Sequence, residues 1–243
     1  MSKQAIVKID EDNHVVKLSV GDVEINLEDA PHILIAGMNN SGKTTLIHEM
    51  ITDLMGKYKS DELNFMIADF AGTNYQTFNE SPFLKDGHII SELKEFVNKL
   101  DEIVGEIENR FEILNEYNLK NIDLVYEDNN VCSLPRIIVF VDEFTGILNS
   151  NISIKRQFLR DVQIIGAKGR AVGIHMIFST ALEKGLNNEI LMANFPCRIV
   201  FNVPNKKFSY LVMGNSDAVD LKEKEMIIIG PMCSKAIKSK FYS

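Results

Sequence analysis

The segment GMNNSGKT, residues 37–44, constrains the fold of this 243-residue chain more than any other feature. It directly follows the continuous apolar run HILIA (32–36) and precedes a segment whose apolar residues recur at spacings of three and four. A continuous apolar run is typical of a strand buried on both faces, and the later spacing is typical of a helix with one buried stripe. A G-x-x-x-x-G-K-[ST] turn between such a strand and such a helix predicts a phosphate-binding loop.

Each fixed residue of this loop has a chemical role. Gly37 and Gly42 let the backbone wrap closely around a phosphate, while successive N–H groups and the helix N-terminus supply partial positive charge. Lys43 is placed to reach the β- and γ-phosphate oxygens, and the Thr44 hydroxyl to ligate Mg²⁺. The sequence therefore predicts ATP and Mg²⁺ as cofactors.

A second apolar run, RIIVFVDE (136–143), supplies the acidic residues that phosphoryl transfer needs. Asp142 falls at the carboxyl end of this run, where ligands of parallel sheets collect, and is predicted to hold the Mg²⁺ shell. Glu143 comes next and is predicted to orient and activate water against the γ-phosphate. Lys43 and Glu143 are thus candidate catalytic residues, and the phosphate is predicted to be hydrolysed.

Apolar runs alternate with amphipathic segments through the rest of the chain. This alternation predicts an α/β fold with right-handed crossovers and a mostly parallel sheet covered by helices on both faces. We expect one ATPase domain over residues 31–243, because no Pro/Gly/Ser-rich linker divides it, and a β-hairpin extension over residues 1–30 that packs on it. The expected elements are a hairpin or short meander within 5–27 around the turn EDN, strands at 32–36, 63–69, 136–143, 174–180 and 197–203, helices from about 89 to 117 and from about 153 to 167, a loop at 118–134, a loop and short helix between the strands at 174–180 and 197–203, and a final strand pair around MIIIG and IKSKFY.

Composition removes several classes of protein. A formal charge of −8 and a pI near 5.2 exclude a surface coated in basic residues, but a ring can hide a basic patch in its pore, so nucleic acid binding stays open. Three distant cysteines without a C-x-x-C pair indicate neither a disulfide framework nor a zinc site. The N-terminus lacks the apolar run of a signal peptide, and no segment approaches the roughly 20 apolar residues of a membrane helix. We therefore expect a soluble, cytoplasmic chain without a membrane segment of its own.

Six segments resemble, in the same order, the ATP-driven motor of the FtsK/SpoIIIE family. The resemblance runs from about residue 20 to residue 232, and such collinear agreement is more specific than any single motif. The segments are PHILIAGMNNSGKTTLIHEMI, LNFMIADFAG, GEIENRFEILNEYNLKNIDLVYED, IIVFVDEFTGIL, GAKGRAVGIHMIFST and ANFPCRIVFNVPNKKFSYLVMG.

The resemblance implies a RecA-like P-loop NTPase that forms a hexameric ring around double-stranded DNA and hydrolyses ATP at subunit interfaces. Arg110 and Arg170 match family arginines and are the candidates for the arginine that crosses such an interface, where its guanidinium stabilises the charge on the transferring phosphoryl group. A surface arginine that solvates a helix or loop stays open as the alternative for each. Arg198 also matches a family arginine, without an assigned role.

Departures from the family pattern bear on turnover and on cargo. Thr180 is followed by Ala181 where the family usually has a glutamine, which leaves Thr180 as the sensor candidate at that position. Asp69 is followed by Phe-Ala-Gly instead of Pro-Lys-Gly, and LKEKEMIII stands where the family has a Gly-rich turn. From these departures together, the missing glutamine included, we expect slow hydrolysis or altered coupling. From the length of the chain, we expect neither a membrane-spanning region before the motor nor a winged-helix domain after it. We expect a compact DNA motor of a plasmid, conjugative element or phage, recruited by a membrane or relaxosome partner.

Two alternatives to a DNA translocase stay open: a type VII-like protein-secretion ATPase, and a low-turnover ATP-binding structural or regulatory subunit. His32 and His175 are expected to be packed, hydrogen-bonded histidines. The strongest local cluster of basic residues consists of Lys155, Arg156, Arg160, Lys168 and Arg170. These residues either bind along a phosphate backbone or form a solvent-exposed helix face. The predicted nucleotide-binding residues are Gly37, Asn39, Asn40, Ser41, Gly42, Lys43, Thr44, Thr45, Asp142 and Thr180, with Thr44 and Asp142 as the Mg²⁺ ligands.

Overall fold

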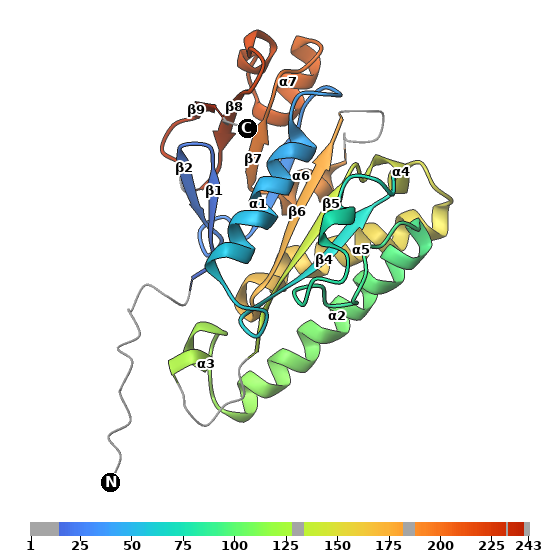
Figure 1. Cartoon of the computed structure of the whole chain (residues 1–243), viewed down its shortest axis with the longest axis vertical. Coiled ribbons are helices and arrows are strands. Elements are labelled where there is room, and N and C mark those ends of the chain that lie inside the picture. Colours follow the sequence, from blue (N-terminus) through green and yellow to red (C-terminus); the bar gives the residue numbers. More distant parts are fainter. Residues whose placement is uncertain (1–14, 128–133, 182–187, 232, 241–243) are drawn as a thin grey trace.

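The computed structural model describes residues 15–127, 134–181, 188–231 and 233–240. Figure 1 shows a central sheet with helices on both faces and a small separate hairpin beside it. The strands are β1 (Lys17–Val20), β2 (Val23–Asn26), β3 (His32–Ala36), β4 (Leu63–Asp69), β5 (Arg136–Asp142), β6 (Ile174–Thr180), β7 (Cys197–Val200), β8 (Glu225–Ile229) and β9 (Ile237–Lys240). The α-helices are α1 (Lys43–Lys57), α2 (Leu93–Glu116), α3 (Asp123–Glu127), α4 (Thr145–Leu148), α5 (Ile152–Lys168), α6 (Glu189–Asn194) and α7 (Lys206–Met213), and the 3-10 helices are η1 (Gln76–Phe78), η2 (Gly169–Val172) and η3 (Asp217–Asp220).

The central sheet has the strand order β4-β5-β6-β3-β7-β8-β9. The strands from β4 to β7 run parallel, while β8 is antiparallel to β7 and β9 to β8, so the sheet is mostly parallel as predicted. The chain passes from β3 to the far edge at β4, returns strand by strand to β6, and then crosses to β7 on the other side of β3. The strand order thus reverses at β3, and ligands of such sheets bind at the carboxyl ends of the strands at this point.

Both faces of the sheet are covered, which explains the continuous apolar runs. Every residue of β3, β5 and β6 is buried. In β3, Ile33 and Ile35 pack with α1 and the hairpin, whereas Leu34 and Ala36 pack with α2 and α5 on the opposite face. A strand buried on both faces needs apolar side chains at successive positions rather than at alternate ones.

The β1–β2 hairpin packs against α1 and against the edge of the sheet formed by β9. Tyr58, just after α1, donates its hydroxyl to the Val15 carbonyl oxygen at 3.1 Å and accepts the Lys17 N–H at 3.0 Å. The hairpin turns at Gly21, with φ of 58°, and a Cβ there would lie 2.3 Å from the carbonyl oxygen of Lys240 in β9. The expected EDN turn lies outside the described residues.

Helix α2, helix α3 and strand β7 differ from the sequence-based expectation. Helix α2 begins at Leu93 rather than near 89, because the chain before it runs along the edge strand β4 and forms bridges there, from Leu84 to Phe65 and from Ile90 to Ala68. The short helix α3 lies in a segment predicted to be loop, where Ile122 and Val125 are buried in the core. Strand β7 ends at Val200, three residues before the predicted end.

Among the described residues, no helix combines the length and the apolar character that crossing a bilayer requires.

Candidate nucleotide-binding and hydrolysis site

The phosphate loop joins β3 to α1 in a conformation that its residue types allow. Asn40 and Gly42 have φ values of 60° and 109°, in the left-handed region that Asn and Gly tolerate best. Gly37 has no room for a side chain, because a Cβ there would lie 2.6 Å from Ser41 Oγ and 2.7 Å from Phe201 Cβ. The loop can therefore bend closely around a ligand at the N-terminus of α1.

Lys43 is the first residue of α1, and its side chain bends back over the loop. Nζ donates to the carbonyl oxygens of Gly37 at 3.1 Å and Met38 at 2.9 Å. Burial lowers the pKa of Lys43, while the nearby carboxylates of Glu143 and Asp142 act in the opposite direction. The ammonium group thus lies between the loop and two carboxylates, where phosphate oxygens can replace the loop carbonyls as its partners.

Asp142 ends β5 and is buried, with 7% of its surface exposed. Thr44 Oγ1 donates to Asp142 Oδ2 at 2.8 Å, and Asn74 Nδ2 lies 3.4 Å from the same oxygen. Ser179 Oγ donates to Oδ1. The Thr44 hydroxyl and the Asp142 carboxylate are oxygen ligands of the kind that Mg²⁺ prefers, so this pair fits the ion. Among the described residues, no group of three or more His, Cys, Asp or Glu side chains is arranged to hold a metal.

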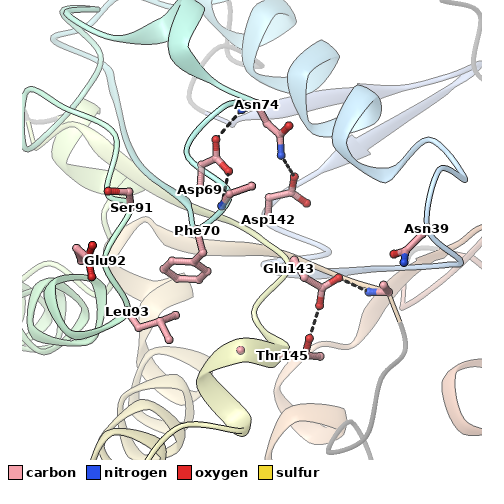
Figure 2. Close-up of a pocket in the computed structure, with 13 residues that line it drawn as sticks. Asn39, Asp69, Phe70, Asn74, Ser91, Glu92, Leu93, Asp142, Glu143 and Thr145 are labelled. Carbon is pink, nitrogen blue, oxygen red and sulfur yellow. Dashed lines mark hydrogen bonds between the residues drawn. The ribbon is translucent and has the colours of Figure 1, made fainter.

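Glu143 follows with φ of 57°, so the chain turns sharply at the end of β5. Its carboxylate accepts the backbone N–H of Ala181 at 2.6 Å and the hydroxyl of Thr145. Its own N–H donates to Ser179 Oγ at 3.1 Å. Figure 2 shows the carboxylate between the end of β6 and the start of α4. The turn and these donors fix the direction of the only side chain predicted to activate water.

A cavity of about 670 Å³ opens beside the phosphate loop, within the size range of ordinary small-molecule sites. Its walls come from the phosphate loop, the ends of β4 and β5, and the starts of α2 and α4 (Figure 2). The lining residues are Asn39, Asp69, Phe70, Ala71, Asn74, Ser91, Glu92, Leu93, Asp142, Glu143, Thr145, Gly146 and Ala181. Asp142 and Glu143 therefore face one shared space next to the loop.

The other predicted nucleotide-binding residues lie around the same point. Asn39 and Asn40 are exposed in the loop, and Thr45 is exposed on the first turn of α1. Thr180 is fully buried at the end of β6, and its carbonyl oxygen accepts the Gly37 N–H at 3.3 Å. Strand β6 thus supports the phosphate loop through its backbone at this position.

Arg110, predicted to cross a subunit interface, lies in the protein interior with 2% of its surface exposed. Its guanidinium donates to Glu106 and, at 2.8 Å each, to the carbonyl oxygens of Val172 and Pro135. All these partners belong to the same chain, at the end of the sheet opposite the phosphate loop. A guanidinium in this position cannot reach another subunit without unfolding its surroundings, so the placement argues against the predicted role.

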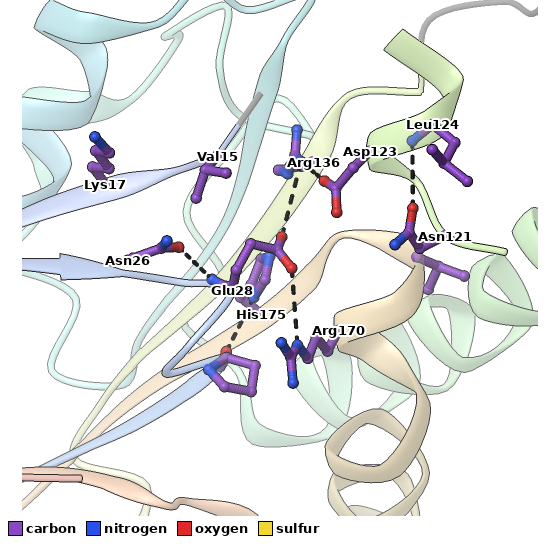
Figure 3. Close-up of polar contacts among 12 residues, drawn as sticks. Val15, Lys17, Asn26, Glu28, Asn121, Asp123, Leu124, Arg136, Arg170 and His175 are labelled. Atoms are coloured by element: carbon purple, nitrogen blue, oxygen red, sulfur yellow. Dashed lines mark hydrogen bonds and ion pairs between the residues drawn. The ribbon is translucent and has the colours of Figure 1, made fainter. Parts of the chain in front are cut away.

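Arg170, the second candidate, lies in η2 with 59% of its side chain exposed. Its only ion pair among the described residues is with Glu28 at 3.8 Å, and Glu28 also approaches Arg136 at 3.9 Å (Figure 3). Arg198 is different, because its guanidinium donates to the carbonyl oxygens of Val212 and Met192 within the chain. Of the three family-matched arginines, Arg170 is the one whose guanidinium a neighbouring molecule can reach.

His32 and His175 are packed and hydrogen-bonded at the amino ends of β3 and β6, as predicted. His32 Nδ1 accepts the Met176 N–H at 3.1 Å, and His175 Nδ1 lies 3.1 Å from the Pro31 carbonyl oxygen. Burial lowers the pKa of His32 to about 4 and that of His175 to about 3. Both rings are neutral near pH 7 and lie far from the phosphate loop.

Sequence reasoning missed Ser179, Asn74 and Tyr75, whose side chains lie at Asp142. The signal for Ser179 was its position at the end of the buried strand beside β5, where side chains meet those at the end of β5. Asn74 and Tyr75 lie in the irregular segment after β4, which has no periodicity to place them. Burial raises the pKa of Tyr75, with the negative charge of Asp142 as the next cause.

Comparison with known proteins connects this site to a family. The family model described as FtsK/SpoIIIE family matches residues 12–184, which is most of the chain and includes the phosphate loop, Asp142 and Glu143. The chain belongs to the FtsK/SpoIIIE family. The DNA translocase FtsK of Borreliella burgdorferi is 26% identical over 223 residues, and that of Streptococcus agalactiae is 28% identical over 218 residues. These alignments cover 89% and 85% of this chain but only 28% and 26% of the relatives, so the chain spans about a quarter of their length.

Solved structures share the fold of this FtsK/SpoIIIE member. The monomer form of the pCW3 conjugation coupling protein TcpA with ATPγS has a TM-score of 0.76 and 22% identity, over 96% of this chain and 67% of that one. The cytoplasmic domain of the Thermomonospora curvata type VII secretion ATPase EccC has a TM-score of 0.78 and 22% identity, over 95% of this chain and 28% of that one. The fold is therefore that of the P-loop ATPases, as predicted.

Proposed function

We propose that this chain is the motor of an ATP-driven DNA translocase, which hydrolyses ATP with Mg²⁺ at the subunit interfaces of a hexameric ring. The observation that carries the proposal is the convergence of Lys43, Thr44, Asp142 and Glu143 on the phosphate loop and the cavity beside it. The family membership and the names of the curated relatives support DNA as the cargo, which we propose to be double-stranded. DNA transfer or segregation by a plasmid, conjugative element or phage is the proposed setting.

Hydrolysis in this site follows from the positions of three side chains. Water attacks the γ-phosphorus, the bond to the ADP oxygen breaks as the new bond forms, and Glu143 accepts the proton that the water loses. Ala181 N–H and the Thr145 hydroxyl hold the Glu143 carboxylate for that task. Lys43 exchanges its loop carbonyls for phosphate oxygens and offsets their charge.

The metal is assigned to the hydroxyl and carboxylate that already meet in the site. Thr44 and Asp142 would hold Mg²⁺, which neutralises phosphate charge when bound. Ser179 and Asn74 keep the Asp142 carboxylate oriented through the contacts described above.

Arg170 is the proposed arginine that a neighbouring subunit supplies. Its exposure and its long ion pair with Glu28 leave the guanidinium accessible to a second copy. The exposed Arg156 and Lys168 of α5 are proposed to contact the DNA backbone. We further propose that residues 31–243 form the ATPase domain and that residues 1–30 are a hairpin extension of it.

The test is steady-state ATP hydrolysis with and without long double-stranded DNA, at low and moderate salt, with nucleotide binding measured alongside. We expect DNA to stimulate the wild-type protein and Lys43→Ala to lose both nucleotide binding and turnover. Glu143→Gln is expected to lose about 10²- to 10⁴-fold in turnover while it still binds ATP, because only proton acceptance is removed. Equal turnover by wild-type and Glu143→Gln protein would show that Glu143 is not the catalytic base.

The same assay separates the alternatives. Turnover that DNA does not stimulate would contradict the DNA cargo and favour a protein-moving motor. Nucleotide binding without turnover under every condition would contradict the motor and favour a structural or regulatory subunit.

A further inference from the structure

Tyr75 is a buried polar residue that the proposed mechanism does not use. It lies between β4 and η1, and only 1% of its surface is exposed. Its ring is stacked on His48 of α1, with centroids 6.3 Å apart and an interplanar angle of 22°, and on Phe78, at 6.4 Å and 27°. Within the described residues its hydroxyl has no hydrogen-bond partner. A phenylalanine would make the same stacking contacts without burying an unsatisfied hydroxyl.

The unsatisfied hydroxyl lies close to the proposed metal ligands. It lies beside the Asp142 carboxylate and the Thr44 hydroxyl. His48 comes one helical turn after Thr44, so a ring stacked on His48 lies along the side of α1 that carries Thr44. The Tyr75 hydroxyl, a buried donor without a partner, therefore lies near the contact between Thr44 and Asp142.

Asp69, at the end of β4, holds the backbone turn that carries Tyr75 through two hydrogen bonds. Asp69 accepts the N–H of Ala71 at 3.1 Å through Oδ1 and that of Asn74 at 2.7 Å through Oδ2. Asn74 in turn has its side-chain amide 3.4 Å from Asp142 Oδ2. Two consecutive residues, Asn74 and Tyr75, thus approach the same carboxylate from an anchored turn.

We propose that Tyr75 is a positioning residue for the metal site, and that its hydroxyl donates to the Asp142 carboxylate when Thr44 and Asp142 hold the ion. This inference rests on the proposed function, because it requires that ion. A donor on the outer side of a ligand carboxylate fixes its orientation and tunes the metal, and loss of such partners usually lowers metal affinity. The Asp142 carboxylate then keeps a fixed direction while its other contacts rearrange around the nucleotide.

The experiment compares Tyr75→Phe with wild-type protein in calorimetric titrations of ADP, once with Mg²⁺ and once with EDTA. The ratio of ADP affinity with Mg²⁺ to ADP affinity with EDTA measures what the ion contributes. We expect this ratio to be about tenfold smaller in Tyr75→Phe than in wild-type protein. Its affinity in EDTA and its melting temperature without nucleotide should equal those of wild type, or the melting temperature should rise. Tyr210→Phe is the matched control, because Tyr210 is 58% exposed on α7 and should change nothing.

Each outcome of this experiment has one meaning. If wild-type protein binds ADP equally with Mg²⁺ and EDTA, the metal site of the proposed function is wrong. If Mg²⁺ strengthens binding equally in wild-type and Tyr75→Phe protein, the role of Tyr75 is wrong while the proposed function stands. Equal losses in Mg²⁺ and in EDTA would assign Tyr75 a purely structural role and also overturn the inference.

Discussion

At the scale of single residues, Arg110 and Arg170 illustrate how two arginines with the same predicted role can lie in opposite environments. Both match family arginines, but Arg110 is 2% exposed and its guanidinium joins α2 to carbonyl oxygens of Val172 and Pro135. Arg170 is 59% exposed with one long ion pair. The first arginine therefore stabilises the fold, and only the second is free to act on another molecule.

This contrast predicts different results for two substitutions. Arg110→Met removes the Arg110 donors from the buried carbonyl oxygen of Val172 and the partly buried one of Pro135, so we expect it to lower the free energy of unfolding by about 3 kcal/mol or more. Arg170→Ala removes only a long ion pair at the surface and should change the free energy of unfolding by less than about 0.5 kcal/mol. Urea unfolding of both variants measures the difference. An Arg110→Met protein as stable as wild type would contradict the structural role.

At the scale of elements, the sequence predicted where the strands lie along the chain but not how they pair with one another in the sheet. The runs at 32–36, 63–69 and 174–180 coincide with β3, β4 and β6, because burial on both faces leaves a continuous apolar signal. The segment along the edge of β4 and helix α3 carry no such signal, since each is placed by contacts with distant residues.

The candidate site follows the same division. The phosphate loop, Asp142 and Glu143 are local motifs at strand ends and were found from the sequence. Ser179 and Tyr75 reach Asp142 only through the pairing of β6 with β5 and the turn after β4. Residues of this kind cannot be located until the register of the sheet is known.

The histidine pair between β3 and β6 predicts a pH dependence of stability. Burial lowers the folded-state pKa of His32 to about 4 and of His175 to about 3, so the unfolded chain binds more protons below pH 6.5. Stability should therefore fall as pH drops from 6.5 towards 4, by about 1.4 kcal/mol per pH unit for each histidine. Asp161 opposes this trend below its raised pKa of about 6. Burial is the main cause of that shift.

Substitution of one histidine isolates its share of the effect. His175→Asn keeps a donor near the Pro31 carbonyl oxygen but does not titrate. Urea unfolding at pH 7, 6 and 5 measures how steeply the free energy of unfolding changes with pH. In His175→Asn this slope should be smaller by about 1.4 kcal/mol per pH unit, the contribution of one histidine. An unchanged slope would show that His175 is not the titrating group.

At the scale of the whole molecule, the two proposed halves of the catalytic site lie at opposite ends of the sheet. Lys43 and Glu143 lie at the carboxyl ends of the parallel strands, while Arg170 precedes β6 at their amino ends. One copy cannot bring its own Arg170 to its own phosphate loop. If Arg170 acts in hydrolysis, a complete site requires the phosphate loop of one subunit and the arginine of the next, as a head-to-tail ring provides.

Mixing two inactive variants tests this arrangement directly. Lys43→Ala subunits keep a working Arg170, and Arg170→Ala subunits keep a working phosphate loop. An equal mixture should recover about a quarter of wild-type DNA-stimulated turnover, because half of the loops are intact and half of those face an intact arginine. Mixing wild-type protein with Lys43→Ala subunits controls for simple dilution. If the mixture of the two variants stays as inactive as each variant alone, Arg170 does not act across the interface, and another residue must complete the site.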